Sequence, residues 1–414
     1  MQIFSISSTA INKAYQLLIP LYCFALPFSM KVTNILTLLL AVIWITNKGW
    51  KSILQSEHAR FLVLAWGGYF LLQVIGCFYS EGLDTAFGGL EKKLVIIVFP
   101  ILLANVKIDS QLLNNALRSF IIGVLLAGIL VIAHFYIYTP EKGLFNVVHF
   151  SLRILKIDPI YFSSYVLAAL VFLFYLRKNF QIPLLLLFFL LLGFYLFIFP
   201  SRMTLFLFFV MIVFYFIFQL LKSKKILIPI GIMVSFLVAF FIMYQQSYIL
   251  KWKFDDLIGL DLNNLKINKK EMGEGDHGVD YRVIKWQSAI NIIRENPILG
   301  VGTGDEKNEL LMQYKNHNFV QGMEKTYNAH NEYLSEAIRH GIIGLLIFCL
   351  VLFLTIKISY KNQNYLFIAF MVIILCIFLI ESYLSRQRGA VFFAFFSTLL
   401  FYYGVTNPPK KLSF

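Results

Sequence analysis

One short stretch of this 414-residue chain combines a residue that can do acid–base chemistry with residues that shape a helix. His330 and Asn331 come directly before a segment with a helical pattern, and Gly341 and Gly344 follow within it. An imidazole titrates near neutral pH, so His330 can accept a proton from an attacking hydroxyl. The two glycines allow another helix to approach closely. On residue types alone, an interfacial histidine beside a packing motif is the simpler interpretation.

A second polar group has the residue types of a cation site, but its setting argues against that role. Glu274, Asp276, His277 and Asp280 lie close together in the sequence, and carboxylate oxygens are ligands for divalent cations. They stand among glycines, which is typical of a mobile, solvated loop. The glycines of segment 300–304 lack the strand and helix context of a nucleotide site and predict a turn. We therefore predict chemistry without a metal or a nucleotide.

The composition shows what kind of protein must position these residues. The chain is 59% apolar and 14% charged, whereas a soluble domain carries roughly 25% charged residues. This excludes a water-soluble enzyme, a disordered chain and a disulfide-built secreted domain. No basic face with interleaved aromatic residues indicates a nucleic-acid partner. All four cysteines lie within apolar runs, which argues against structural disulfides and zinc: Cys23, Cys77, Cys349 and Cys376.

About twelve apolar runs approach the length of roughly 20 residues that a helix needs to cross a bilayer. They predict an all-α polytopic membrane protein with about twelve transmembrane helices, the first of them retained rather than cleaved as a signal peptide. With the N-terminus in the cytoplasm, the short cytoplasmic loops hold 15 basic and two acidic residues. Such an excess of basic residues is expected on that side. Both termini are therefore predicted to be cytoplasmic.

The remaining polar residues concentrate in one segment, 245–340, which this orientation places outside the membrane. It holds 12 basic and 14 acidic residues and leaves 24 basic and eight acidic residues for the rest of the chain. We predict about nine helices at 1–244, one large outer loop at 245–340 and about three helices at 341–414. Within the loop, segment 281–295 is predicted to be an amphipathic helix that lies on the membrane or caps the bundle. Its apolar stripe is Val283, Trp286, Ile290 and Ile293.

Three motifs resemble those of one family. His330-Asn331, followed after nine residues by Gly341-x-x-Gly344, resembles the signature of the O-antigen ligase family, whose relatives are O-antigen polymerases and bacterial O-oligosaccharyltransferases. A second similarity joins Arg282, Trp286 and Ala289 to the run Asn296-Pro297-Ile298-Leu299-Gly300-Val301-Gly302. Ser201-Arg202, at the outer end of a predicted span, is the third. The resemblance implies a GT-C-like helical bundle with one large periplasmic loop that contains short helices.

The resemblance also implies a reaction and its participants. The donor would be a glycan on undecaprenyl diphosphate, and the acceptor a hydroxyl of lipid A–core on the periplasmic face of the bacterial inner membrane. A guanidinium grips phosphate oxygens bidentately, so Arg202 and Arg282 are the candidates for holding the diphosphate. His330 would take the proton of the acceptor hydroxyl. Transfer would invert the anomeric carbon, with no metal and no cofactor.

Several further residues on the predicted outer face are accessory candidates. Asn331 belongs to the histidine motif, and Glu381 ends a predicted span, where it would pair with a nearby arginine. Arg339 and His340 lie beside the Gly341 turn and receive no role. Interfacial anchoring is the alternative for the four bases that would widen the phosphate site: Lys92, Lys93, Arg386 and Arg388.

Other functions remain open at this stage. Within the family, a polymerase would use another lipid-linked repeat unit as acceptor, and an O-oligosaccharyltransferase would use a protein hydroxyl. A polysaccharide transporter or flippase would also have about twelve spans. Against it, the candidate residues gather on one face, whereas transporter sites lie near the bilayer midplane and usually contain ionisable residues. The sequence leaves the sugar specificity and the oligomeric state undecided.

Overall fold

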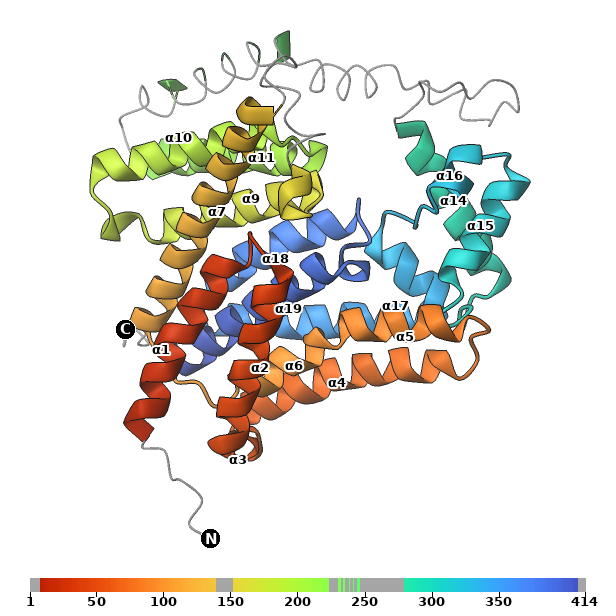
Figure 1. The fold of residues 1–414 in the computed structure, drawn as a ribbon, viewed down its shortest axis with the longest axis horizontal. Coiled ribbons are helices and arrows are strands. Elements are labelled where there is room, and N and C mark those ends of the chain that lie inside the picture. Colours follow the sequence, from red (N-terminus) through yellow and green to blue (C-terminus); the bar gives the residue numbers. More distant parts are fainter. Residues whose placement is uncertain are drawn as a thin grey trace. The chain divides into compact units, whose positions relative to one another are not determined.

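The computed structural model describes residues 8–138, 152–222 and 279–408, together with scattered positions between 230 and 245. Within these ranges every regular element is a helix (Figure 1), which confirms the predicted helical fold class. The predicted span at 226–244 falls largely outside the described residues. So do Glu274, Asp276 and His277 of the acidic cluster.

The chain forms two compact units. The first comprises residues 1–26, 30–116 and 261–414, and the second comprises 27–29 and 117–260. The helices of the first unit are α1 (Ser8–Ala25), α2 (Met30–Thr46), α3 (Trp50–Gln55), α4 (Glu57–Cys77), α5 (Leu83–Lys93), α6 (Val95–Leu103), α14 (Val279–Glu295), α15 (Glu306–Asn316), α16 (Val320–Glu324), α17 (Glu332–Lys361), α18 (Tyr365–Phe378), the 3₁₀ turn η5 (Tyr383–Ser385) and α19 (Gln387–Thr406).

The second unit holds the middle of the chain. Helix α7 (Ser110–Tyr138) begins in the first unit and continues into the second. The other elements there are η3 (Leu152–Leu155), α9 (Pro159–Tyr175), η4 (Arg177–Asn179), α10 (Ile182–Ile198) and α11 (Arg202–Lys222). Inside this unit, the Tyr195 hydroxyl of α10 donates a hydrogen bond to the Leu125 carbonyl of α7 at 2.9 Å.

Four of the described helices, α4, α7, α17 and α19, are long and apolar enough to cross a membrane. The helices α2, α9, α10 and α18 and residues 202–217 are apolar but shorter. The helical membrane fold is thus supported, whereas the count of twelve spans is not confirmed. The predicted span at 94–105 contains only the nine-residue helix α6, about 14 Å long against a hydrocarbon core of about 30 Å.

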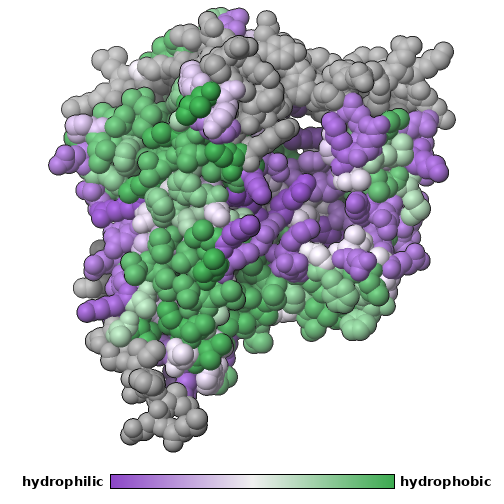
Figure 2. Space-filling view, in the orientation of Figure 1, coloured by the Kyte–Doolittle hydropathy of each residue, from purple (hydrophilic) through white to green (hydrophobic). Residues whose placement is uncertain are grey.

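The surface of α17 is that of a lipid-facing helix. Ile343, Leu346, Leu350 and Phe353 recur every three or four residues, and all four side chains are exposed. A soluble protein rarely exposes such a continuous apolar stripe. Figure 2 shows broad apolar regions over the long helices of the first unit, with hydrophilic residues gathered toward α14–α16. The long helices therefore suit a hydrocarbon environment, and the α14–α16 end suits water.

Helix α14 confirms the predicted helix at 281–295, and it ends before Asn296-Pro297 as expected. The predicted apolar stripe packs only in part, because Ile293 lies against a small core whereas Ile290 is 41% exposed. The helix buries Tyr281, Ile284 and Ile292 in this core, together with residues of α15 and the segments that follow it. Both faces of this helix carry apolar residues, and the sequence alone did not show which one meets protein.

Helix α17 is broken at Gly341, where φ is +60° and ψ is −158°. The break frees backbone groups that segment 297–302 satisfies. Val301 and Gly302 donate to the carbonyls of Ile338 and Arg339, each at 2.9 Å, and Ile342 donates to the carbonyl of Pro297 at 2.9 Å. A side chain at Gly341 would collide with the Ile298 backbone. Segment 297–302, which crosses α17 here, thus explains why position 341 is a glycine. The sequence instead predicted that another helix packs closely against this residue.

The same loop is fastened to the turn between α4 and α5. The Asp305 carboxylate accepts hydrogen bonds from the backbone N–H groups of Glu81 and Gly82, at 2.8 and 2.7 Å. The Thr303 hydroxyl donates to the Gln73 carbonyl at 2.6 Å. The second half of the predicted outer loop is therefore tied to the helical bundle, and this attachment fixes the start of α17.

Candidate functional site

His330 stands immediately before the cap of α17 in an unusual backbone conformation. Its φ is +47°, a left-handed value that non-glycine residues adopt rarely and that gathers at functional sites. The His330 N–H donates to the Asn328 side chain at 3.1 Å. Asn331 caps the helix, since its side-chain oxygen accepts from the Leu334 N–H at 3.1 Å. The histidine is thus held at a fixed turn in front of a helix N-terminus.

Glu381 fixes the imidazole ring. Nδ1 of His330 lies 2.9 Å from Oε2 of Glu381, and the two side chains are 27% and 9% exposed. When Nδ1 donates its proton to the carboxylate, Nε2 is left as the proton acceptor. This His–carboxylate pair can receive a proton from a hydroxyl at its exposed side. The sequence indicated an arginine partner for Glu381, and the structure pairs it with His330.

Two residues that the sequence did not single out extend this pair. The Tyr327 ring meets the His330 ring edge-on, with centroids 5.8 Å apart. Nζ of Lys285 lies 3.7 Å from the centroid of the same Tyr327 ring. Lys285 is 6% exposed. Burial, reinforced by the neighbouring charges of Arg282 and Lys325 and opposed by Glu381, lowers its pKa to about 7.

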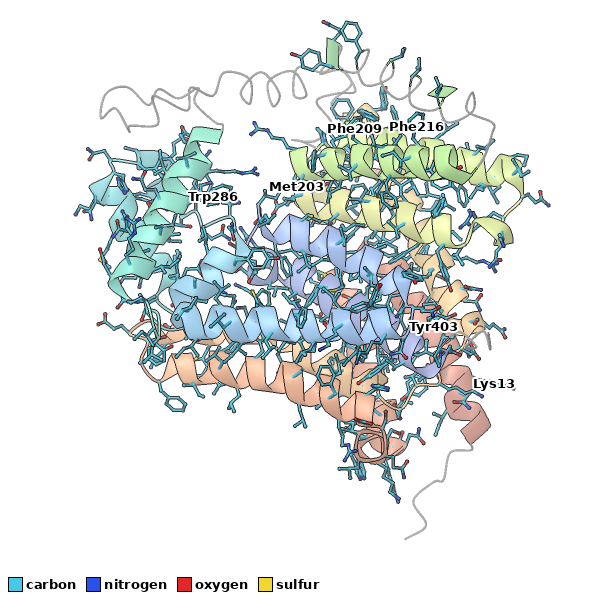
Figure 3. All side chains as sticks on the ribbon, turned by 180° about the vertical axis from the view of Figure 1, so that it is seen from behind. Lys13, Met203, Phe209, Phe216, Trp286 and Tyr403 are labelled. Atoms are coloured by element: carbon cyan, nitrogen blue, oxygen red, sulfur yellow. The ribbon has the colours of Figure 1, made fainter. Side chains whose placement is uncertain are left out.

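The two arginines predicted to bind phosphate belong to different units. Arg282 lies on α14 one turn before Lys285, so the two side chains share a helix face. Trp286, labelled in Figure 3, follows them on the same helix. Arg202 begins α11 in the second unit, where it follows the buried Ser201. Within the first unit, Arg282 therefore lies on the same helix as Lys285, whose neighbour Tyr327 contacts His330.

The accessory bases fall into two groups. Lys92 and Arg386 expose their charges at the end of α5 and just before α19. Arg388 is buried and its guanidinium donates to the Leu26 carbonyl at 3.4 Å. Lys93 is 3% exposed and forms an ion pair with Glu336. Of these four, only Lys92 and Arg386 present the open charge that an added phosphate contact needs.

Lys93 belongs to a buried charge network centred on Arg339. The guanidinium of Arg339 pairs with Glu306 and Glu336, the second at 3.0 Å, and lies 3.9 Å from Glu332. The network therefore contains two cations and three carboxylates, drawn from α5, α15 and α17. It accounts for Arg339, to which the sequence gave no role.

Neutral groups complete this network and connect it to the site. Gln73 donates to Glu336 at 2.8 Å and accepts from Lys93 at 3.1 Å. Arg339 also donates to the Ser385 hydroxyl at 2.8 Å, and Glu332 accepts from the Leu384 N–H at 2.8 Å. Both of these partners lie in η5, just after Glu381. The network thus holds the segment that presents Glu381 to His330.

In the portions of the chain that the structure describes, no three His, Cys, Asp or Glu side chains are arranged to hold an ion. The His330–Glu381 pair is a histidine and one carboxylate, which is a proton-transfer arrangement rather than a ligand set.

The comparison with known families addresses the resemblance directly. Residues 186–349 match the model of the O-antigen ligase family. This part of the chain is similar to O-antigen ligases. This confirms the resemblance drawn from the histidine motif and supports a glycosyltransferase of the ligase and polymerase type. No curated protein matches the chain.

The matched ligase segment contains Arg202, Arg282 and His330, together with Lys285. Two partners lie outside it: Glu381, which orients the histidine, and Lys93, which closes the buried network. The contacts of the candidate site therefore extend to residues before and after the matched segment. Proximity along the chain did not indicate these partners, because each meets its counterpart only in the fold.

Proposed function

We propose that this chain is a membrane glycosyltransferase that moves a glycan from undecaprenyl diphosphate to an acceptor hydroxyl of lipid A–core. The observation that carries this proposal is the His330–Glu381 pair, in which His330 lies just before α17 with 27% of its side chain exposed. It lies within reach of the aqueous α14–α16 end and beside a helix apolar enough to cross a membrane. A hydroxyl from water and a donor from lipid can both approach such a place.

The chemistry follows from the positions of these groups. The acceptor hydroxyl gives its proton to Nε2 of His330 while its oxygen attacks the anomeric carbon of the donor sugar. The bond from that carbon to the diphosphate oxygen breaks, and its electron pair leaves with the diphosphate. Glu381 stabilises the imidazolium that forms. Direct displacement inverts the anomeric carbon and requires neither a metal nor a nucleotide.

Negative charge on the departing diphosphate needs positive partners. Arg282 lies on α14 with Lys285, close to the His330–Glu381 pair. We assign to it the binding of the diphosphate, with Arg202 as the second arginine of the donor site. A guanidinium remains charged throughout the reaction and forms paired hydrogen bonds to phosphate oxygens.

The location follows from the same proposal. The protein would be a multi-pass protein of the bacterial inner membrane with both termini in the cytoplasm. The segment 245–340 would face the periplasm as one functional part between helical parts at 1–244 and 341–414. The excess of basic residues in the opposite loops supports this orientation.

A polymerase is the second candidate, because the matched family supports ligases and polymerases alike. The two reactions share the donor, the base and the bond that breaks. They differ in the acceptor, which for a polymerase is the end of another lipid-linked repeat unit. Transfer to lipid A–core and transfer to a lipid-linked repeat unit therefore distinguish the two candidates.

Transfer by the purified full-length protein tests the proposed function. The donor is undecaprenyl-diphosphate-linked glycan, and lipid A–core and a lipid-linked repeat unit are offered as acceptors. His330→Ala is compared with wild type and with His58→Ala, a histidine at the start of α4 outside the motif. We expect His330→Ala to lower kcat by about 10²- to 10⁴-fold, the usual contribution of a general base. We expect His58→Ala to act like wild type. Full activity of His330→Ala would refute the assigned base.

A further inference from the structure

Lys285 is a buried cation without an ionic partner among the described residues. It is 6% exposed, and its close contact is the face of the Tyr327 ring, 3.7 Å from Nζ to the centroid. Burying an ammonium group costs free energy unless hydrogen bonds or opposite charges compensate it. A cation–π contact supplies only part of that compensation.

Lys93 shows how this protein compensates a buried lysine when the role is structural. It is buried to a similar extent, yet it pairs with Glu336 and donates to Gln73 and to the Tyr69 hydroxyl, at 3.1 and 3.0 Å. Among the described residues, Lys285 has neither an ion pair nor a hydrogen bond of this kind. The comparison indicates that Lys285 is held ready for an anion that comes from outside the protein.

The surroundings of Lys285 select the kind of anion. Among the described residues, the charged and titratable groups that face it are Arg282 on its own helix, Lys325 and Tyr327 after α16, and Glu381 before η5. Glu381, the single carboxylate among them, already binds His330. The balance is therefore positive, and it lies beside the proposed base. Burial, together with these cations, lowers the pKa of Lys285 to about 7.

Resting on the proposed function, we propose that Lys285 is a further donor-site residue, which takes up a proton when the diphosphate binds and then holds the leaving diphosphate together with Arg282. Before the donor binds, a large fraction of the Lys285 side chains is in the neutral amine form near pH 7. A diphosphate anion favours the ammonium form, so binding draws one proton from solvent. The ammonium N–H groups then donate to phosphate oxygens.

The glycosyl transfer itself leaves this proton in place. The electron pair of the broken carbon–oxygen bond leaves on the diphosphate, and the acceptor proton goes to His330. Lys285 keeps its proton until the diphosphate dissociates, and then returns it to solvent. No oxidant, reductant or further reactant enters. Arg282 supplies permanent charge, whereas Lys285 supplies charge that depends on donor binding.

A purely structural role makes a different prediction. In that case Lys285 would pack on Tyr327 and thereby steady His330, and its protonation would not respond to the donor. Arginine would then replace lysine without changing how binding depends on pH.

Binding of undecaprenyl diphosphate to the detergent-solubilised full-length protein distinguishes the two roles. Its Kd is measured from pH 6 to pH 9 for wild type, Lys285→Arg, Lys285→Met and Lys315→Met, an exposed control on α15. Above pH 7, we expect wild-type affinity to fall relative to Lys285→Arg by up to about tenfold per pH unit, since one proton must be taken up. The ligand's own titration is common to both proteins and cancels.

The methionine variant adds an independent check. Lys285→Met should bind more weakly than wild type at pH 6, where wild type carries the charge, and should approach wild type at pH 9. Parallel pH profiles for wild type and Lys285→Arg, or wild-type binding by Lys285→Met at pH 6, would overturn the inference. In that event, loss of transfer in His330→Ala would leave the proposed function standing. Failure of wild type to bind undecaprenyl diphosphate would contradict both.

Discussion

Two groups of charged residues lie at the start of α17, and they are built in opposite ways. Around Arg339, five ionisable side chains are almost fully buried and contact one another. Around His330, the histidine is 27% exposed with a single carboxylate partner, and Lys285 beside it has no carboxylate within ion-pair distance among the described residues. The charges around Arg339 compensate one another, whereas the groups around His330 can still form bonds to a substrate.

The two groups suit different roles, because the Arg339 network stabilises the structure and the His330–Glu381 pair can react with a substrate. A buried ion pair adds little net stability, but removal of one partner is costly because the other charge is left alone. The Arg339 network therefore locks α5, α15, α17 and η5 into one arrangement. The His330 pair lies at the edge of that arrangement, with its ring fixed and one nitrogen available. A rigid support and an incomplete pair together make a site that can accept a substrate.

Breaking the buried network should have the largest effect on stability. We expect Lys93→Met to lower the free energy of unfolding by about 3–5 kcal/mol, since Glu336 and its neighbours lose their compensating charge. Lys92→Met, at the exposed neighbouring lysine, should change it by less than about 0.5 kcal/mol. Thermal unfolding in detergent measures both. Equal melting temperatures for the two variants would contradict the structural role of the network.

Removing the second partner sharpens this test. Lys93→Met combined with Glu336→Leu removes both charges, so part of the lost stability should return. If the double variant unfolds at a lower temperature than the sum of the two single changes predicts, the Lys93–Glu336 pair is not the contact that Lys93→Met disrupts.

A smaller loss of stability should follow Gly341→Ala. The residue has φ of +60° and faces the Ile298 backbone, so a methyl group adds strain of about 1–3 kcal/mol as well as a collision. The matched control is Gly68→Ala in α4, where a methyl group meets nothing within 4 Å. The control should unfold at or slightly above the wild-type temperature. Tolerance of alanine at 341 would show that the loop crossing does not require glycine.

Changing the incomplete pair should affect the reaction rather than stability. We expect Glu381→Gln to lower kcat by about 10- to 100-fold, because an amide orients the ring but does not stabilise the imidazolium. The KM for the donor and the unfolding temperature should stay close to wild type. An unchanged kcat would mean that the 2.9 Å contact between Glu381 and His330 has no part in the reaction.

Local features of the site were predictable from the sequence. His330, the turn at 300–304 and the helix at 281–295 follow from residue types and spacing, and the structure places each near its expected position. The helical membrane class follows from composition. These features depend on neighbours a few residues away, where helical periodicity and turn preferences act directly.

The pairings were not predictable, because they join residues far apart along the chain. Glu381 is 51 residues from His330, and Lys93 is 243 residues from Glu336. A single sequence shows that each is charged but not which opposite charge the fold brings near. The burial of Lys285 was not predictable for a related reason, since a lysine beside an apolar stripe normally lies in water. Only packing around Tyr327 shows that it is buried.

The central claim is that His330, held by Glu381, carries out glycosyl transfer. The surface glycans of a deletion strain test it most directly when the strain is complemented with wild type or with His330→Ala at equal membrane levels. We predict full-length glycan on undecaprenyl diphosphate and none on lipid A–core, restored by wild type alone. Long chains lost with one repeat unit still attached would indicate the polymerase instead. Restoration by His330→Ala, or unchanged glycans in the deletion strain, would contradict the claim.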